Sequence, residues 1–139
     1  MIEQARRIAV IGGSRIPFCR SNTVYSSKSN MDLLSAALQG LIDRFDLHGK
    51  QFDEVIAGAV TTHSRDWNLA REALQSTTMS PLTPGITLQQ ACATSLQGAL
   101  MIGAKIATGQ IECGIAAGTD TTSDFPVVYG KKFSARVAK

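Results

Sequence analysis

Apolar residues recur every three or four positions along residues 33–45, a spacing that places side chains on one face of a helix. Ser29 or Asn30 can cap this helix at its start, because both side chains accept hydrogen bonds from free backbone N–H groups. The same spacing returns over residues 68–78 and over residues 93–109. The pattern therefore predicts three helices.

Four apolar segments without helical spacing alternate with these helices. They are residues 7–11, 55–60, 86–90 and 113–119. Strands of this kind, separated by helices in the order β-α-β-α-β-α-β, predict an α/β fold with a mostly parallel sheet and helices on both faces. Beyond Asp120 the pattern dissolves, and we expect no further element.

The composition fits one globular domain, because 139 residues that are 44% hydrophobic and 18% charged suffice for a core. No stretch reaches the roughly 18 uninterrupted apolar residues of a membrane span. The start also lacks an apolar core of signal-peptide length, so we expect a cytoplasmic protein. The net charge of +3 arises mainly at the chain ends, which favours solvated termini over nucleic-acid binding.

Three cysteines, Cys19, Cys92 and Cys113, form no CxxC pair and leave an odd thiol, which suits a reducing compartment. His48 and His63 do not lie near a cysteine pair, so we expect no metal site. Cys19 and Cys113 are interpreted as structural. His63 follows a predicted parallel strand at its carboxyl end, where α/β sites gather, but a lone loop histidine is more often simply solvated.

Cys92 lies on the predicted turn between the strand at 86–90 and the helix at 93–109. The positive end of the helix dipole and unpaired backbone N–H groups favour a thiolate at such a place. The same N–H groups can hold the oxyanion of an acyl transfer to sulfur. By position alone, a small hydrophobic core residue is the alternative. Gly98 and Gly103 give the helix a small face, so another backbone can approach it closely.

Residues 90–99 (QACATSLQGA) resemble the segment that carries the nucleophile of thiolases, although the family usually has a small pair such as Ser-Gly soon after the cysteine. Three further stretches are similar to that family in order and spacing. They are residues 7–18 (RIAV leading to RIPF), 68–72 (NLARE) and 109–120 (GQIE leading to AAGTD). The chain is thereby identified as resembling the N-terminal half of a thiolase over nearly its whole length.

The resemblance implies an acyltransferase that cleaves 3-ketoacyl-CoA, as in fatty acid β-oxidation, or runs the reverse Claisen condensation. Cys92 would attack the 3-keto carbon, release acetyl-CoA and hold the acyl group until free coenzyme A takes it. Coenzyme A and acyl-CoA are then substrates, and no cofactor is bound permanently. Thiolases are homodimers or dimers of dimers, and residues 86–90 match the edge strand that pairs across the dimer.

The resemblance also implies that residues 1–120 form the N-terminal α/β core and that residues 121–139 begin a loop domain that is truncated. Thiolases draw an activating histidine and a second, proton-moving cysteine from a C-terminal half that is not in this sequence. Loss of such proton transfer costs a factor of about 10² to 10⁴, so we predict negligible turnover from these residues alone.

Two alternatives stay open at this point. A ketoacyl-synthase-type condensing enzyme also uses a cysteine on such a turn, but the early position of Cys92 and the Ala-Thr-Ser that follows favour a thiolase. A non-catalytic module that binds acyl-CoA weakly, or only associates with other chains, is favoured by the absence of a second half.

Overall fold

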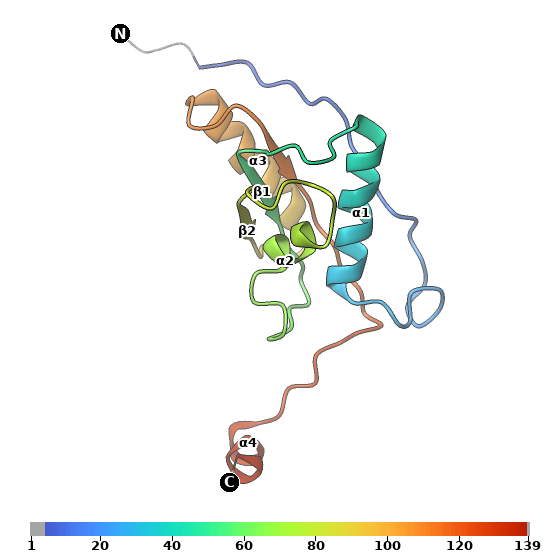
Figure 1. The fold of residues 1–139 in the computed structure, drawn as a ribbon. Coiled ribbons are helices and arrows are strands. Elements are labelled where there is room, and N and C mark those ends of the chain that lie inside the picture. Colours follow the sequence, from blue (N-terminus) through green and yellow to red (C-terminus); the bar gives the residue numbers. More distant parts are fainter. Residues whose placement is uncertain (1–4, 139) are drawn as a thin grey trace.

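The computed structural model describes residues 5–138, in which helices and strands alternate (Figure 1). The elements are α1 (Asn30–Phe45), β1 (Glu54–Ala57), α2 (Leu69–Gln75), β2 (Gly85–Thr87), α3 (Thr94–Ala107), β3 (Gly114–Ala116) and α4 (Lys131–Val137). The three strands are parallel and lie in the order β2-β1-β3. The predicted α/β class is confirmed, as are three helices and three strands, with each strand shorter than expected.

β1 lies in the middle of the sheet, and all four of its residues are buried. Backbone hydrogen bonds continue past the strand ends on both sides. The N–H of Leu88 donates to the carbonyl of Ala57 at 2.9 Å, and the N–H of Thr119 donates to the carbonyl of Gly58 at 3.0 Å. Because the strands are parallel, the loops that follow them gather at one edge of the sheet, the carboxyl edge.

Helices cover both faces of the sheet, as the sequence predicts (Figure 1). On one face, Val55 and Ala57 join a core cluster with α1 and α2. That cluster includes Leu34, Leu38, Ile42, Leu69, Ala70, Ala73 and Leu74. On the other face, α3 packs over Ile56, whose Cγ2 would lie 3.3 Å from a Cβ at Gly98. Lys105 of α3 forms an ion pair with Glu54 of β1, with Nζ 2.5 Å from Oε2.

Of the two residues predicted as possible N-caps of α1, Ser29 and Asn30, the structure shows Ser29 in that position. Ser29 is the N-cap: its hydroxyl accepts the N–H of Asp32, and the Asp32 carboxylate accepts the N–H of Ser29. This reciprocal arrangement is a capping box. Asn30 is instead the first helical residue and is 1% exposed, with its side chain turned to the loop after β1.

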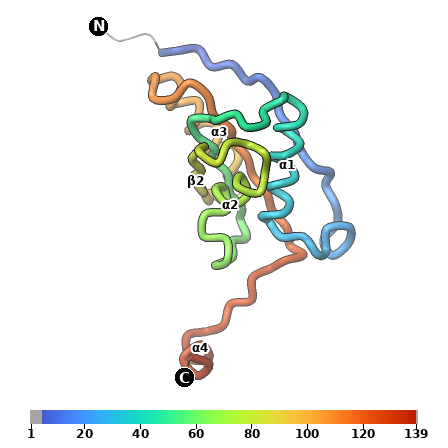
Figure 2. The backbone as a smooth tube through the Cα atoms, in the orientation of Figure 1, coloured from blue at the N-terminus to red at the C-terminus, as the bar shows by residue number. Residues whose placement is uncertain are grey.

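The prediction of a strand at residues 7–11 is wrong. Residues 6–14 are extended but pair with no strand in the described part of the chain, and Val10 and Ile11 are 93% and 87% exposed. The segment runs from the end of α3 toward α1 (Figure 2), with the N–H of Arg6 donating to Ala107 and the carbonyl of Gly13 accepting from Arg44. A β-branched run becomes a strand only when it pairs with a neighbouring backbone, and within residues 5–138 this run has no such pairing.

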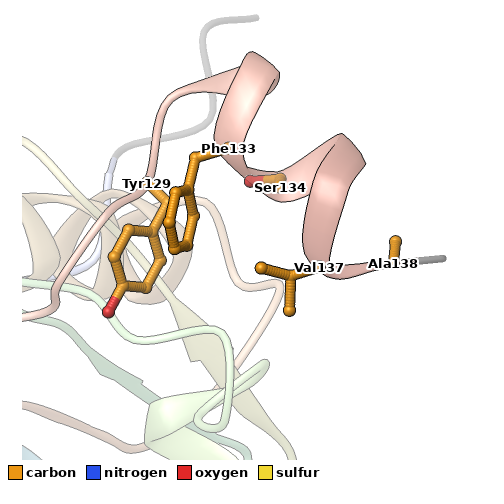
Figure 3. A pocket seen from close by; sticks show the side chains of 5 residues that line it. All are labelled: Tyr129, Phe133, Ser134, Val137 and Ala138. Carbon is orange, nitrogen blue, oxygen red and sulfur yellow. The ribbon is translucent and has the colours of Figure 1, made fainter.

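The expectation that no element follows Asp120 is wrong, because α4 forms over Lys131–Val137. This helix of seven residues lies apart from the sheet (Figure 1), and none of its residues is buried. The rings of Tyr129 and Phe133 stack at 4.5 Å between centroids beside an open apolar hollow of about 270 Å³ (Figure 3). Two turns are too few for a helical period to emerge from the sequence. In the part of the chain that the structure describes, no helix is long and apolar enough to cross a bilayer.

Candidate functional site

Cys92 lies at the carboxyl edge of the sheet, on the turn that joins β2 to α3, and its side chain is exposed. Ala91, immediately before it, has φ of 46°, in the left-handed region that a residue with a Cβ seldom adopts. The buried side chain of Thr94 closes the turn, because its hydroxyl accepts the N–H of Gln90 at 2.9 Å and donates to the carbonyl of Ala91 at 2.7 Å. Backbone strain held by surrounding contacts is characteristic of functional turns.

The first turn of α3 has no side-chain cap, since its N-cap residue is Ala93. Within residues 5–138, the backbone N–H groups of Ser95 and Leu96 donate to no acceptor. Such free N–H groups, together with the helix dipole, attract a negative charge to the start of a helix. The arrangement can therefore stabilise an oxyanion that forms next to Cys92.

Three close backbone approaches fix this turn on the sheet. A Cβ added at Gly58, just after β1, would lie 1.7 Å from the carbonyl oxygen of Leu88 and 3.0 Å from Cγ2 of Thr94. A Cβ added at Gly118, after β3, would lie 2.9 Å from Cβ of Ser95. The expectation that a backbone approaches the small face of α3 closely is confirmed, since a Cβ at Gly98 would lie 3.4 Å from the carbonyl oxygen of Ile56.

Within residues 5–138, no hydrogen bond or ion pair joins His63 to Cys92. Its Nε2 lies 2.7 Å from the backbone carbonyl of Asp124 and 3.6 Å from that residue's carboxylate, and its side chain is 13% exposed. Arg65 forms an ion pair with the same carboxylate. The favoured interpretation of a solvated histidine is therefore wrong, because His63 ties the loop after β1 to the loop after β3.

Neither of the other two cysteines belongs to the turn before α3. Cys19 is exposed in the extended N-terminal segment, and Cys113 is exposed just before β3. Asp53 accepts the N–H of Glu112 at 2.7 Å and of Cys113 at 3.1 Å, and these two bonds hold the pKa of the Asp53 carboxyl below its usual value. Among residues 5–138, no group of three His, Cys, Asp or Glu side chains is gathered closely enough to hold a metal ion.

Sequence reasoning missed four residues that build the site: Gly58, Thr94, Gly118 and Asp120. Asp120 follows β3 and accepts the backbone N–H groups of Val60 and Thr61 after β1. Two signals could have pointed to it: its place just past the carboxyl end of a predicted strand, and its place at the end of the thiolase-like stretch at residues 109–120.

The fold and the site define an α/β protein with an exposed cysteine on a strained turn before an uncapped helix. The chain matches the family model for the thiolase N-terminal domain over residues 8–138. The chain therefore belongs to the thiolase family, as an N-terminal domain, and the predicted resemblance is confirmed.

Named relatives agree with this assignment. A 3-ketoacyl-CoA thiolase of Aliivibrio fischeri is 36% identical over 132 residues, which are 95% of this chain and 30% of the relative. A 3-ketoacyl-CoA thiolase of Shewanella denitrificans is 34% identical over 131 residues, 94% of this chain and 30% of the relative. The chain thus spans less than a third of the length of these relatives.

The fold is shared with a solved structure. The crystal structure of the Bacillus anthracis acetyl-CoA acetyltransferase superposes with a TM-score of 0.85 at 21% identity, over 93% of this chain and 33% of that chain. At this identity the likeness concerns the fold, and it confirms the predicted N-terminal thiolase fold as part of a larger one.

Proposed function

We propose that this chain supplies the nucleophile half of a thiolase active site and that Cys92 is the acyl-accepting nucleophile. One observation carries the proposal: an exposed cysteine precedes a helix whose first N–H groups, on Ser95 and Leu96, have no acceptor among residues 5–138. A thiolate is the reactive form of cysteine, and a helix N-terminus favours it. Family membership gives this geometry its reaction class.

The proposed reaction is thiolytic cleavage of a 3-ketoacyl-CoA. The sulfur of Cys92 forms a bond to the 3-keto carbon, and the bond between carbons 2 and 3 breaks. The departing carbon takes up a proton and leaves as acetyl-CoA, while the acyl group stays on the sulfur as a thioester. Free coenzyme A gives up its thiol proton, takes the acyl group and restores Cys92; the reverse sequence is a Claisen condensation. The free N–H groups at the start of α3 are the donors available to the oxyanion.

We further propose that the residues which move these protons lie in the two thirds of the relatives' length that this chain does not match. His63 is not proposed as the base, because no hydrogen bond or ion pair joins it to Cys92 within residues 5–138 and its Nε2 lies 2.7 Å from the carbonyl oxygen of Asp124 instead. Residues 1–120 then form the catalytic core and residues 121–139 begin a loop domain. β2 is an edge strand, so a second copy can pair there in the proposed homodimer. We place the complete enzyme in acyl-CoA breakdown in the cytoplasm.

The proposal is tested by treating the purified chain briefly with acetoacetyl-CoA, and separately with limiting iodoacetamide, and mapping the modified cysteine by mass spectrometry. We expect acetylation and faster alkylation at Cys92 than at Cys19 and Cys113, all of which are exposed. The matched controls are Cys92→Ser, which should abolish acetylation, and Cys19→Ser with Cys113→Ser, which should preserve it. Equal labelling of all three thiols without acetylation would favour the non-catalytic module.

A further inference from the structure

Asp120 joins the loops that follow β1 and β3. Its carboxylate accepts three hydrogen bonds from the β1 loop: from the N–H of Val60 at 2.8 Å, from the N–H of Thr61 at 3.0 Å and from the hydroxyl of Thr61 at 2.7 Å. Bonds from several donors to one ionised acceptor are stronger than ordinary backbone bonds and fix the geometry of both partners. The two loops therefore hold one relative position at the carboxyl edge.

α1 adds a third element to this junction. The side chain of Asn30, at 1% exposure, donates from Nδ2 to the carbonyl of Thr61 at 2.6 Å and to its hydroxyl oxygen at 3.0 Å. Thr61 is thus held from both sides, by Asn30 and by Asp120. Asn30 is buried and Thr61 is half-buried, whereas Asp120 is exposed. The junction resists local displacement because several hydrogen bonds to Thr61 must break together.

The loop that Asp120 anchors is also the surface on which the first turn of α3 rests. Gly118 lies against Ser95, with room for no side chain between them, and the N–H of Thr119 donates to the carbonyl of Gly58 at 3.0 Å. Gly58 in turn contacts Leu88 and Thr94, which flank the turn of Cys92. A continuous set of contacts therefore runs from Asp120 to the turn that presents the thiol.

We propose that Asp120 is a positioning residue for Cys92, acting through Gly118 and Ser95. This inference rests on the proposed function of Cys92. Both carboxylate oxygens of Asp120 accept hydrogen bonds from Val60 and Thr61, so the role proposed for Asp120 is to hold the loop and not to contact the substrate. A displacement of about 1 Å at a reacting group is enough to slow a reaction a hundred-fold, so fixing the start of α3 affects the reactivity of the sulfur.

The test compares the ratio of iodoacetamide labelling rates at Cys92 and Cys19 in the chain and its variants. Asp120→Asn should lower this ratio by about ten-fold, because the amide group turns a donor toward N–H groups that need an acceptor. The matched control is Asp53→Asn. Asp53 also accepts two backbone N–H groups, but just before β3, at the opposite edge of the sheet from Cys92, and this variant should keep the ratio.

A second pair of variants decides the matter if Asp120→Asn does not fold. Thr61→Val removes the hydroxyl that donates to Asp120 and should lower the ratio, whereas Thr61→Ser keeps the hydroxyl and should restore it. An unchanged ratio in Asp120→Asn and Thr61→Val, or an equal fall in Asp53→Asn, would overturn the positioning role. The ratio in the unaltered chain tests the proposed function separately, since only its change between variants concerns Asp120.

Discussion

The carbonyl oxygen of Leu88 lies against Gly58 so closely that a Cβ at Gly58 would be 1.7 Å from it. Leu88 follows β2 and Gly58 follows β1, and the N–H of Leu88 bonds to Ala57 next to that contact. Only a residue without a side chain permits this approach. The contact sets where the chain leaves β2, and Cys92 comes four residues later.

Gly58→Ala should therefore destabilise the chain and displace the turn before α3. We expect a loss of about 2 kcal/mol or more in the free energy of unfolding, because backbone must move to admit the methyl group. Urea denaturation followed by circular dichroism measures this loss. Gly13→Ala is the control, since a Cβ at Gly13 meets nothing within 4 Å. Equal stability of the two variants would show that the approach at Gly58 is not tight.

Thr94→Val should disturb the turn of Cys92 while leaving the packing of the side chain intact. Valine has the shape of threonine but lacks the hydroxyl that bonds Gln90 and Ala91. Removing that hydroxyl leaves the N–H of Gln90 without its acceptor, whereas the carbonyl of Ala91 still accepts the N–H of Thr94 at 3.2 Å. The loss should cost about 1 kcal/mol. Thr94→Ser keeps the hydroxyl and loses only the methyl near Gly58, so labelling of Cys92 by iodoacetamide should be slowed in the valine variant alone. Slower labelling in the serine variant as well would assign the effect to the methyl group.

The capping box of α1 predicts an acid-sensitive stability. Bonds from the backbone N–H and then the hydroxyl of Ser29 lower the pKa of Asp32 below its usual value. A carboxyl whose folded-state pKa is depressed stabilises the fold above its unfolded pKa, about 4, and this stabilisation is lost as pH falls through the folded pKa. Asp32→Asn should therefore flatten the dependence of unfolding free energy on pH below about 4.

Ser29→Ala provides the check on this interpretation, because it removes the partner instead of the carboxyl. Chemical denaturation from pH 3 to pH 6 should show that the two substitutions together cost less than the sum of their separate costs. Part of the slope should remain, since the pKa of Asp53 is lowered in the same direction. Strict additivity of the two variants would contradict the reciprocal cap.

The outer face of α3 should tolerate charge in this chain. Leu96 and Leu100 are four residues apart on the helix and are 64% and 60% exposed. Leu100→Lys should change the free energy of unfolding by no more than about 0.5 kcal/mol and should reduce self-association measured by sedimentation. Ile102→Lys is the contrast, because Ile102 is 6% exposed and a buried charge there should unfold the chain. Strong destabilisation by Leu100→Lys would mean that this face is covered in solution.

Local patterns predicted the elements that bury their own apolar faces. α1 and α3 carry apolar residues at helical spacing over 16 and 14 residues, and β1 lies in a continuous apolar run. Both patterns can be recognised from the sequence without knowledge of tertiary contacts. The place of Cys92 on a strand-to-helix turn followed from the order of these elements. The resemblance to thiolases then assigned that turn its chemistry, and the family match confirms the resemblance.

Predictions failed or were missing where the deciding partner was not local, as for His63, whose partner Asp124 is 61 residues away. The run at residues 7–11 has the composition of a strand, but it lies extended between α3 and α1 and pairs with no strand within residues 5–138. α4 has only seven residues and no buried side chain, so the sequence shows no apolar period that would predict this helix. A sequence records what a segment prefers, whereas strand formation also requires a neighbour with free backbone groups.

The sequence by itself determined the α/β class, the helix that follows Cys92 and the position of that cysteine at its start, because each depends on short-range spacing. Only the tertiary structure decided that Gly58 and Gly118 seat this helix, that Thr94 closes the turn, and that Asp120 binds Thr61 from a position 59 residues away. Hydrogen bonds and close approaches between distant residues leave no periodic signal along the chain. They arise when folding brings the carboxyl ends of parallel strands to one edge.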